Sequence, residues 1–442
     1  MIRDFTYLQD KFNKKSQDKV VLGKVSGSLW REEVLTEGQL NHHVHIVGAS
    51  GYGKTVLISH IVRQRISQGK GLLFIDLKSD MNTILKFTQY AAQANRIEDL
   101  EIFTLSENKN SVTYNLVQDG TPTQLRDRII LSLNWSEEYY KNQSSSFLLR
   151  LLILLCWLRD NQDLNFHLGT ILDCASSVQK IVELSNMVPM EELKMKANGQ
   201  KLMEFLKEKE KDNLNSLQGL RTQIESIVLS DFGDLIASSE NGINLFEAYQ
   251  KSKIIFLFLD SRRYGETAKS LGRFILQDLK SVSAKVDSDI PIEQRKPFSV
   301  IIDEFSDLAS EDFIGFLDRA RSSRMSIVLA HQEICDLLRV SPEFAGRLMG
   351  NTSTLYAFLQ KRPESAEIIS GMAGTKTVWK QTMQTERIWL LNLDSGNGTR
   401  RETEEFVIHP NLIKTLRVGK CVCVKKYPSS RAYLVDVNSD AS

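Results

Sequence analysis

Short, mostly apolar runs recur along the chain, and most are followed by a helical pattern or by polar residues. They lie at 44–47, 71–76, 102–105, 253–260, 298–304, 327–332 and 354–358. An apolar run of this length is typical of a strand buried on both faces of a parallel sheet. Strands that alternate with helices place those helices on both sides of the sheet. We therefore predict an α/β fold with a mostly parallel, doubly wound sheet.

The middle of the chain has a different pattern. From about residue 121, apolar residues recur every three or four positions, which predicts helices rather than strands. The predicted helices cover 121–133, 146–159, 165–184, 190–210 and 214–229. We expect an all-α insertion domain over 136–235. Two further short strands, near residues 20–22 and 34–35, and a β-hairpin formed by 419–424 and 432–437 are expected close to the two ends.

Residues 48–55 read GASGYGKT and fit the pattern G-x-x-x-x-G-K-[ST] in full. Glycines permit backbone angles that turn successive N–H groups inward around phosphate oxygens. Lys54 is placed to reach the β- and γ-phosphates of a nucleotide, and the Thr55 hydroxyl to bind Mg²⁺. The helix predicted over 56–65 adds a dipole that favours anions. A chance glycine-rich turn is the alternative to ATP binding by these residues: Gly48, Ser50, Gly51, Tyr52, Gly53, Lys54 and Thr55.

This motif makes the predicted fold a RecA-like P-loop NTPase. Its first half would occupy 1–135, together with the N-terminal strands, and its second half 236–442, with the C-terminal hairpin. The strand at 298–304 ends in Asp303 and Glu304, which is a Walker B pattern. Asp303 would hold Mg²⁺ through water, and Glu304 would orient and polarise the attacking water. Lys78 and Asp80 follow another strand end, at the sheet edge where ligands collect.

Two more groups are candidates for catalysis. Gln332 ends the strand at 327–332, where its amide could contact the γ-phosphate or the water and report hydrolysis to the rest of the subunit. Arg319, Arg321 and Arg324 lie on the helix before that strand and at its exit. They are either solvated charge or include an arginine finger that completes a neighbouring subunit's site.

Composition narrows the choice of partners and location. A net charge of +1 gives no global field for nucleic acid, so DNA contacts would need a local surface. Five scattered cysteines fit reduced thiols in the cytosol, and Cys421 and Cys423 fit a strand better than a metal site. The apolar stretch 147–158 is too short to span a bilayer and predicts a buried helix. Histidines at 42, 43 and 45 lack an accompanying acid or cysteine cluster, which disfavours a metal site.

The ordered motifs resemble the type IV secretion coupling proteins of conjugation, the TraG/TraD class, within the FtsK/HerA-like group of hexameric DNA pumps. The matching blocks are HIVGASGYGKT (45–55), IDLKSD (75–80), YNL (114–116), VIIDEF (300–305), RARSSRMSIVLAHQE (319–333), RPESAEIISGMAG (362–374) and FVIHPNLIKTLRVGKCVCV (406–424). The resemblance implies that Lys54 and Thr55 belong to Walker A, that Asp303 and Glu304 form Walker B, and that Gln332 is a sensor glutamine. Arg321 falls at the family's arginine-finger spacing before that glutamine.

The family implies a ring-forming ATPase, with ATP and Mg²⁺ as cofactors. Such a motor moves single- or double-stranded DNA and delivers a relaxase–DNA substrate to a secretion channel and its ATPases. Family members usually begin with transmembrane helices, and none is visible in this sequence. We expect a cytoplasmic protein, attached peripherally to the inner membrane through a partner if at all. The alternatives are a soluble HerA- or FtsK-like ATPase of DNA processing or defence, and a slow ATP-dependent switch or binding protein.

Overall fold

The computed structural model describes residues 19–106, 111–207, 216–237, 242–388 and 391–437. The chain forms two compact units. Unit 1 comprises residues 1–61 and 328–442, and unit 2 comprises residues 62–327. The division predicted from the sequence, at 135 and 235, remains a prediction. Helix α3 (Lys54–Ser67) and strand β8 (Met325–His331) each run across a boundary of the two units.

Unit 1 is built on a mixed sheet with strand order β2-β1-β13-β12-β9-β3-β8. Strand β3 is parallel to β8 and β9, and the remaining pairs are antiparallel. The bounds are β1 (Lys19–Val25), β2 (Glu32–Thr36), β3 (Val44–Val47), β9 (Thr354–Ala357), β12 (Lys420–Lys425) and β13 (Arg431–Val437). Strands β12 and β13 are the predicted hairpin, and β1 and β2 confirm the two predicted N-terminal strands. Cys421 and Cys423 are buried free thiols in β12, in agreement with their predicted place in a strand.

Short helices complete unit 1. They are α2 (Glu37–Asn41), α16 (Pro342–Asn351), α17 (Pro363–Ala373) and α18 (Pro410–Lys414), with the 3-10 helix η5 (Ile334–Arg339). Proline at the first position of three of them supplies a fixed φ where no N–H is needed. The apolar sides of α17, α18 and η5 pack on the sheet in one core, which includes Ile369, Ile413 and Val422. The P-loop leaves from β3, which lies between β9 and β8 in this sheet.

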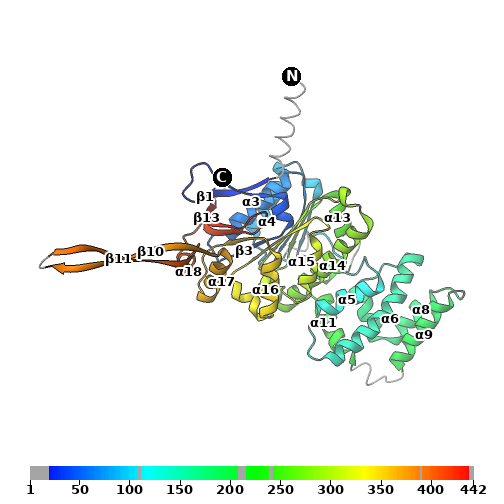
Figure 1. Ribbon diagram of the computed structural model, residues 1–442. Helices are drawn as coiled ribbons and strands as arrows, with labels where there is room; N and C mark the ends of the chain where they lie inside the picture. Colours follow the sequence, from blue (N-terminus) through cyan, green and yellow to red (C-terminus); the bar gives the residue numbers. More distant parts are fainter. Residues whose placement is uncertain (1–18, 107–110, 208–215, 238–241, 389–390, 438–442) are drawn as a thin grey trace. The chain divides into compact units, whose positions relative to one another are not determined.

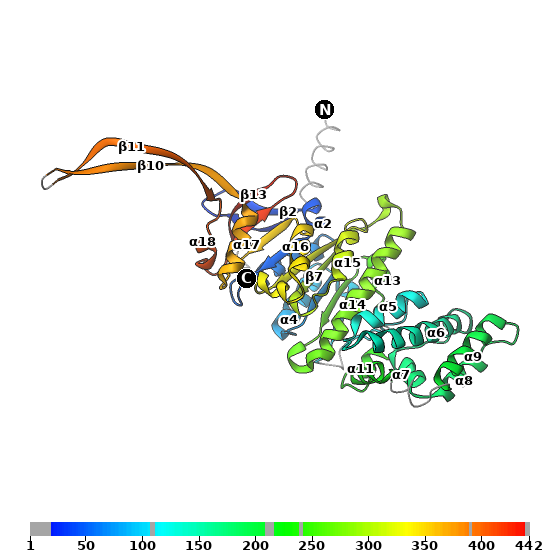
Figure 2. The same ribbon diagram turned by 60° about the horizontal axis from the view of Figure 1, so that its bottom comes forward.

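A long antiparallel ribbon of two strands also belongs to unit 1. Strands β10 (Thr375–Ile388) and β11 (Leu391–Phe406) pair from Thr375 with Phe406 outward and run away from α17 and α18 (Figures 1 and 2). The sequence pattern did not predict these strands. They are rich in threonine and charged residues, so they lack the apolar runs that marked the other strands.

Unit 2 contains a fully parallel sheet with strand order β7-β4-β6-β5. Its strands are β4 (Gly71–Asp76), β5 (Leu100–Thr104), β6 (Ile254–Phe258) and β7 (Phe298–Asp303). Every residue of β4, β6 and β7 is buried, which explains their unbroken apolar runs. The helices are α4 (Met81–Gln93), α13 (Leu245–Lys251), α14 (Ser261–Asp289) and α15 (Phe313–Ala320), with the 3-10 helices η1 (Ile97–Asp99), η3 (Ile292–Gln294) and η4 (Phe305–Asp307).

The rest of unit 2 is a group of helices that we call the helical segment (Figure 2). Its members are α5 (Pro122–Ser132), α6 (Glu138–Gln162), α7 (Leu168–Ser176), α8 (Val178–Asn186), α9 (Leu193–Lys207), α11 (Gln218–Val228) and α12 (Gly233–Ile236). The single helix predicted over 165–184 is wrong: an extended Ser177 (φ −144°, ψ 122°) separates α7 from α8. The apolar stretch 147–158 does form part of a helix, and Leu148, Leu151 and Leu155 within it are fully buried.

Within the described ranges, no helix combines the length and the apolar character needed to cross a bilayer.

Candidate active site

The P-loop connects β3 to α3 in unit 1, as the motif predicted. Its glycines adopt backbone angles that other residues rarely take, with φ of +82° at Gly51 and +118° at Gly53. Gly48 is required for a different reason: a Cβ atom there would lie 2.4 Å from the Cβ of Phe358. The loop is therefore shaped both by its own glycines and by a close neighbour on the chain after β9.

Hydrogen bonds hold the start of the loop and its lysine in place. The Gly48 N–H donates to the carbonyl of His331 at 3.3 Å, and the Ala49 N–H to that of Leu359 at 2.9 Å. The Lys54 ammonium is buried and donates to the carbonyl of Gly48 at 2.5 Å. Thr55, in the first turn of α3, is exposed. A glycine-shaped loop that surrounds an ammonium at a helix N-terminus fits a nucleotide's phosphate groups.

Beneath the P-loop, the side chains of His45 in β3 and His331 in β8 face each other. Their Nε2 atoms lie 2.6 Å apart. Burial lowers the pKa of His331 to about 3, and the charge of Lys54 acts in the same direction. Burial also lowers the pKa of His45 well below its ordinary value. Both rings are thus neutral near pH 7, and one donates its Nε2–H to the other, joining the P-loop strand to the strand that precedes Gln332.

The histidines at 42 and 45 have different partners. The ring of His42 stacks on Tyr427 and donates a hydrogen bond to the carbonyl of Gly38, while His45 pairs with His331. Over the part of the chain that the structure describes, no group of three or more histidine, cysteine or acidic residues could hold a metal ion.

The two predicted acids end β7 in unit 2. Asp303 and Glu304 are 6% and 8% exposed, and Glu304 takes a left-handed backbone conformation with φ of +55°. The Glu304 N–H donates to Oδ1 of Asp303 at 2.9 Å. Asp76 of β4 is paired in register with Asp303. Burial, followed by the charge of Asp303, raises the pKa of Asp76 to about 6.

Lys78 lies beside these carboxylates. Its ammonium forms an ion pair with Oε1 of Glu304. Burial would lower the pKa of Lys78, but the charges of Asp303, Glu304 and Asp76 outweigh it and raise that pKa above its ordinary value. The sequence placed Lys78 at a strand end, but it gave no sign of the pairing with Glu304, because the two residues are far apart along the chain.

The remaining predicted residues lie near the ends of β8 and α15. Gln332 is exposed directly after β8, and its carbonyl accepts from Nε2 of Gln360 at 3.1 Å. Arg321 is exposed at the C-terminal end of α15, and Arg319 is exposed in the last turn. Arg324 has φ of +54° and donates to the carbonyl of Arg295 at 3.1 Å.

The predicted residues are distributed over both units. The P-loop and Gln332 belong to unit 1, whereas Asp303, Glu304 and Arg321 belong to unit 2. That they form a single active site is therefore part of the proposal below.

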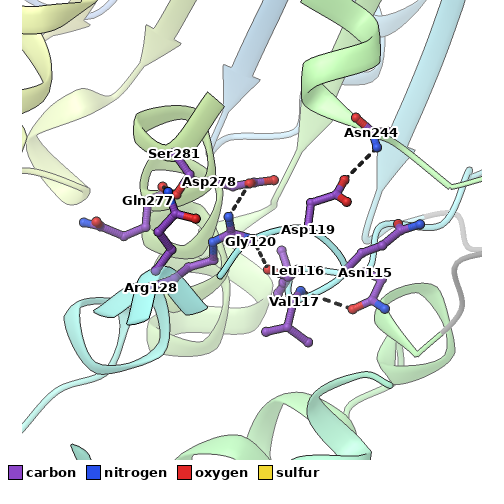
Figure 3. Close-up of polar contacts among 12 residues, drawn as sticks. Asn115, Leu116, Val117, Asp119, Gly120, Arg128, Asn244, Gln277, Asp278 and Ser281 are labelled. Carbon is purple, nitrogen blue, oxygen red and sulfur yellow. Dashed lines mark hydrogen bonds and ion pairs between the residues drawn. The ribbon is translucent and has the colours of Figure 1, made fainter. Parts of the chain in front are cut away.

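A cavity of about 500 Å³ in unit 2 contains none of the predicted residues. Its polar wall is internally paired (Figure 3). Arg128 contacts Asp278 and the carbonyl of Leu116, Tyr114 donates to Asp278, and Asn244 donates to Asp119. The ion pair between Arg128 and Asp278 joins α5 of the helical segment to α14, so this wall of the cavity serves as a structural joint.

Comparison with known proteins defines the class of fold first. TrwBΔN70, a bacterial conjugative coupling protein, aligns with a TM-score of 0.63 at 14% identity, over 94% of this chain and 88% of that one. VirB4 of Thermoanaerobacter pseudethanolicus aligns with a TM-score of 0.58 at 13% identity, over 96% and 97%. The chain thus has the α/β P-loop ATPase fold that was predicted, with a mostly parallel sheet.

Sequence comparison then finds similarity to coupling proteins. Residues 297–417 match the family model described as the TraM recognition site of TraD and TraG. The type 4 coupling protein DotL of Legionella pneumophila is 21% identical over 84% of this chain and 53% of its own length. The chain thus spans about half the length of this curated relative. The resemblance to type IV coupling proteins is confirmed.

Proposed function

We propose that this protein is an ATP-hydrolysing motor that moves DNA, in the role of a type IV coupling protein. The observation that carries the proposal is the P-loop, with the Lys54 ammonium held at its centre. Gly48, Ser50, Gly51, Tyr52, Gly53, Lys54 and Thr55 would surround the phosphates of ATP. There, Lys54 would exchange the carbonyl of Gly48 for phosphate oxygens and offset the charge that develops during phosphoryl transfer.

The acids of β7 have separate tasks in this proposal. Glu304 would orient and polarise the attacking water, and Gln332 would sense the γ-phosphate. Thr55 and Asp303 would hold Mg²⁺, which supplies positive charge against the β- and γ-phosphates when it is bound. Support comes from the chemistry of the donors, a hydroxyl and a carboxylate, which suit this hard cation. In solved structures, the related TrwB is in complex with ADP and Mg²⁺.

Arg321 is proposed as an arginine finger that acts in a neighbouring subunit's site. Its exposed position at the end of α15 supports this role. The active unit would then be a ring, with six subunits as in the FtsK/HerA-like group. The helical segment would engage the DNA, and a relaxase and the secretion-channel ATPases would be further partners. We place the protein in the cytoplasm, with a membrane partner as its link to the channel.

An assay of displacement tests the motor directly. Streptavidin is bound to a biotinylated end of a DNA duplex or single strand, and its ATP-dependent release is followed over time. The proposal predicts release by the wild-type protein with ATP and no release by Lys54→Ala. ATP hydrolysis without displacement of streptavidin from either form of DNA would contradict it.

Two other functions would give different results in these assays. A soluble HerA- or FtsK-like ATPase of DNA processing would displace streptavidin but would bind a nuclease rather than secretion proteins. A slow ATP-dependent switch would bind ATP and hydrolyse it at a rate that DNA does not change.

A further inference from the structure

The ion pair between Lys78 and Glu304 involves the carboxylate that we assign to the attacking water. Oε1 of Glu304 is in contact with the Lys78 ammonium, and the side chains are 28% and 11% exposed. A carboxylate that orients a water must offer an oxygen to it. In this arrangement, one of the two oxygens of Glu304 is committed to a lysine instead. The Lys78 ammonium therefore competes with water for the Glu304 carboxylate.

The segment that carries Lys78 is linked by polar contacts to the start of α14. The Ser79 hydroxyl lies 3.2 Å from that of Ser106, which donates to Oδ2 of Asp260 at 3.1 Å. Asp260 caps α14 by accepting from the Arg263 N–H. A movement at the start of α14 thus has a route to the neighbour of Lys78.

The same strand ends are strained. Ser79, Asp260 and Glu304 have φ of +55°, +43° and +55°, respectively. A non-glycine residue in this region is disfavoured and persists only where its surroundings enforce it. Three such residues follow β4, β6 and β7, so the contacts around this edge must hold the segments in place.

Helix α14 is broken at Gly265 (φ 53°, ψ −127°), and the part after the break contacts the helical segment. Nδ2 of Asn134 donates to Oε2 of Glu266 at 3.3 Å, and Nε of Arg273 donates to the carbonyl of Ser132 at 3.0 Å. Ser132 ends α5, and Asn134 follows it. The helical segment is therefore connected to the part of α14 after the break, and the route from there to Asp260 and the segment of Lys78 passes through Gly265.

We propose that Lys78 is a positioning residue that holds Glu304 in a resting position, and that DNA bound to the helical segment releases it through α14. The inference rests on the proposed function, because it assumes that Glu304 orients the water and that DNA is the ligand. Lys78 would keep ATP turnover low until the motor has its substrate. Its removal should raise turnover without DNA rather than abolish it.

The variant Lys78→Met tests this in steady-state ATP hydrolysis. Without DNA, kcat should rise roughly five-fold, since a partly exposed ion pair is worth about 1 kcal/mol. The KM for ATP should stay unchanged, and the ratio of rates with and without DNA should fall. Lys78→Arg, which keeps the charge, should restore most of the DNA dependence. A lower or unchanged kcat overturns the proposal, and a raised KM would show that Lys78 binds the nucleotide instead.

The polar link has its own variant. Ser106→Ala removes the hydroxyl between Ser79 and Asp260 and touches none of the proposed catalytic residues. DNA-free turnover should stay at the wild-type value, whereas stimulation by DNA should decrease. Full stimulation in Ser106→Ala would contradict release through this route.

A chemical measurement decides whether the ion pair exists even if no ATPase activity is found. The rate at which acetic anhydride modifies the Lys78 amine is followed by mass spectrometry in the wild type and in Glu304→Gln. Loss of the carboxylate should raise the rate several-fold at Lys78 and leave Lys180 unchanged. Equal rates at Lys78 overturn the restraint. A raised rate in a protein without Lys54-dependent turnover would instead place the failure in the proposed function.

Discussion

Arg128 of α5 and Asp278 of α14 form a buried ion pair, with Nη2 of the arginine 2.6 Å from Oδ1 of the aspartate. Their side chains are 2% and 9% exposed, and Tyr114 donates a further hydrogen bond to Asp278 at 2.7 Å. The pair joins the helical segment to the longest helix beside the parallel sheet of unit 2. A protein that couples DNA to ATP hydrolysis needs such a joint between its two working parts.

We predict that Arg128→Met destabilises the protein by about 3–5 kcal/mol, because it leaves the Asp278 carboxylate buried without its cation. Replacing both members, in Arg128→Met with Asp278→Leu, should cost less than the single change. Urea unfolding followed by circular dichroism measures both. Lys180→Met, which breaks the exposed pair with Glu183, is the control and should cost less than about 1 kcal/mol. Equal midpoints for Arg128→Met and the control would contradict a structural role for the joint.

Much of the sheet could be predicted because its strands are buried on both faces. β4 was predicted at its observed bounds, and β3 and β7 to within a residue, since each is an apolar run that ends in glycine or acidic residues. The polar ribbon of β10 and β11 could not be found in this way. Its strands are held by pairing with each other, so their side chains need not be apolar.

The site was predictable only as far as local motifs reach. The P-loop has a fixed spacing because one continuous loop surrounds the phosphates, and the structure gives it the expected conformation. The pairing of Lys78 with Glu304 and of His45 with His331 joins residues more than 200 positions apart. No spacing rule encodes such contacts, and a histidine in an apolar strand gave no sign of its partner.

Lys54→Ala should reduce ATP turnover to background while the free energy of unfolding stays close to that of the wild type. The reason is that the lysine supplies the only charge at the centre of the loop that we assign to the phosphates. Phosphate release from ATP measures the turnover, and urea unfolding verifies the fold. Lys180→Ala serves as the control for a lysine outside the site. Near wild-type turnover in Lys54→Ala would show that the P-loop assignment is wrong.

Glu304→Gln should bind ATP normally but hydrolyse it about 10²- to 10⁴-fold more slowly, since the amide keeps the shape of the side chain and cannot accept the proton. Equilibrium binding of a fluorescent ATP analogue and single-turnover hydrolysis separate the two effects. Asp307→Asn, a nearby half-buried carboxylate beside Lys269, is the matched control. Loss of binding with no separate effect on hydrolysis would make Glu304 a structural residue.

Arg321→Ala should lower turnover by roughly 10³-fold if the arginine completes a neighbour's site. Mixing it with Lys54→Ala should restore activity, because a Lys54→Ala subunit offers an intact Arg321 to an intact P-loop. Arg319→Ala and Arg324→Ala are the controls and should retain activity alone. If both variants assemble and no mixture exceeds either one, the assignment in trans fails.

The central claim is that DNA drives ATP hydrolysis by an assembled P-loop motor. The most direct measurement is ATP turnover per chain with and without DNA, over a series of protein concentrations that spans assembly. We predict that turnover per chain rises with concentration, that DNA raises it further, and that Lys54→Ala removes both effects. A Lys54-dependent rate that neither DNA nor protein concentration changes would contradict the motor and would instead indicate a slow ATP-dependent switch.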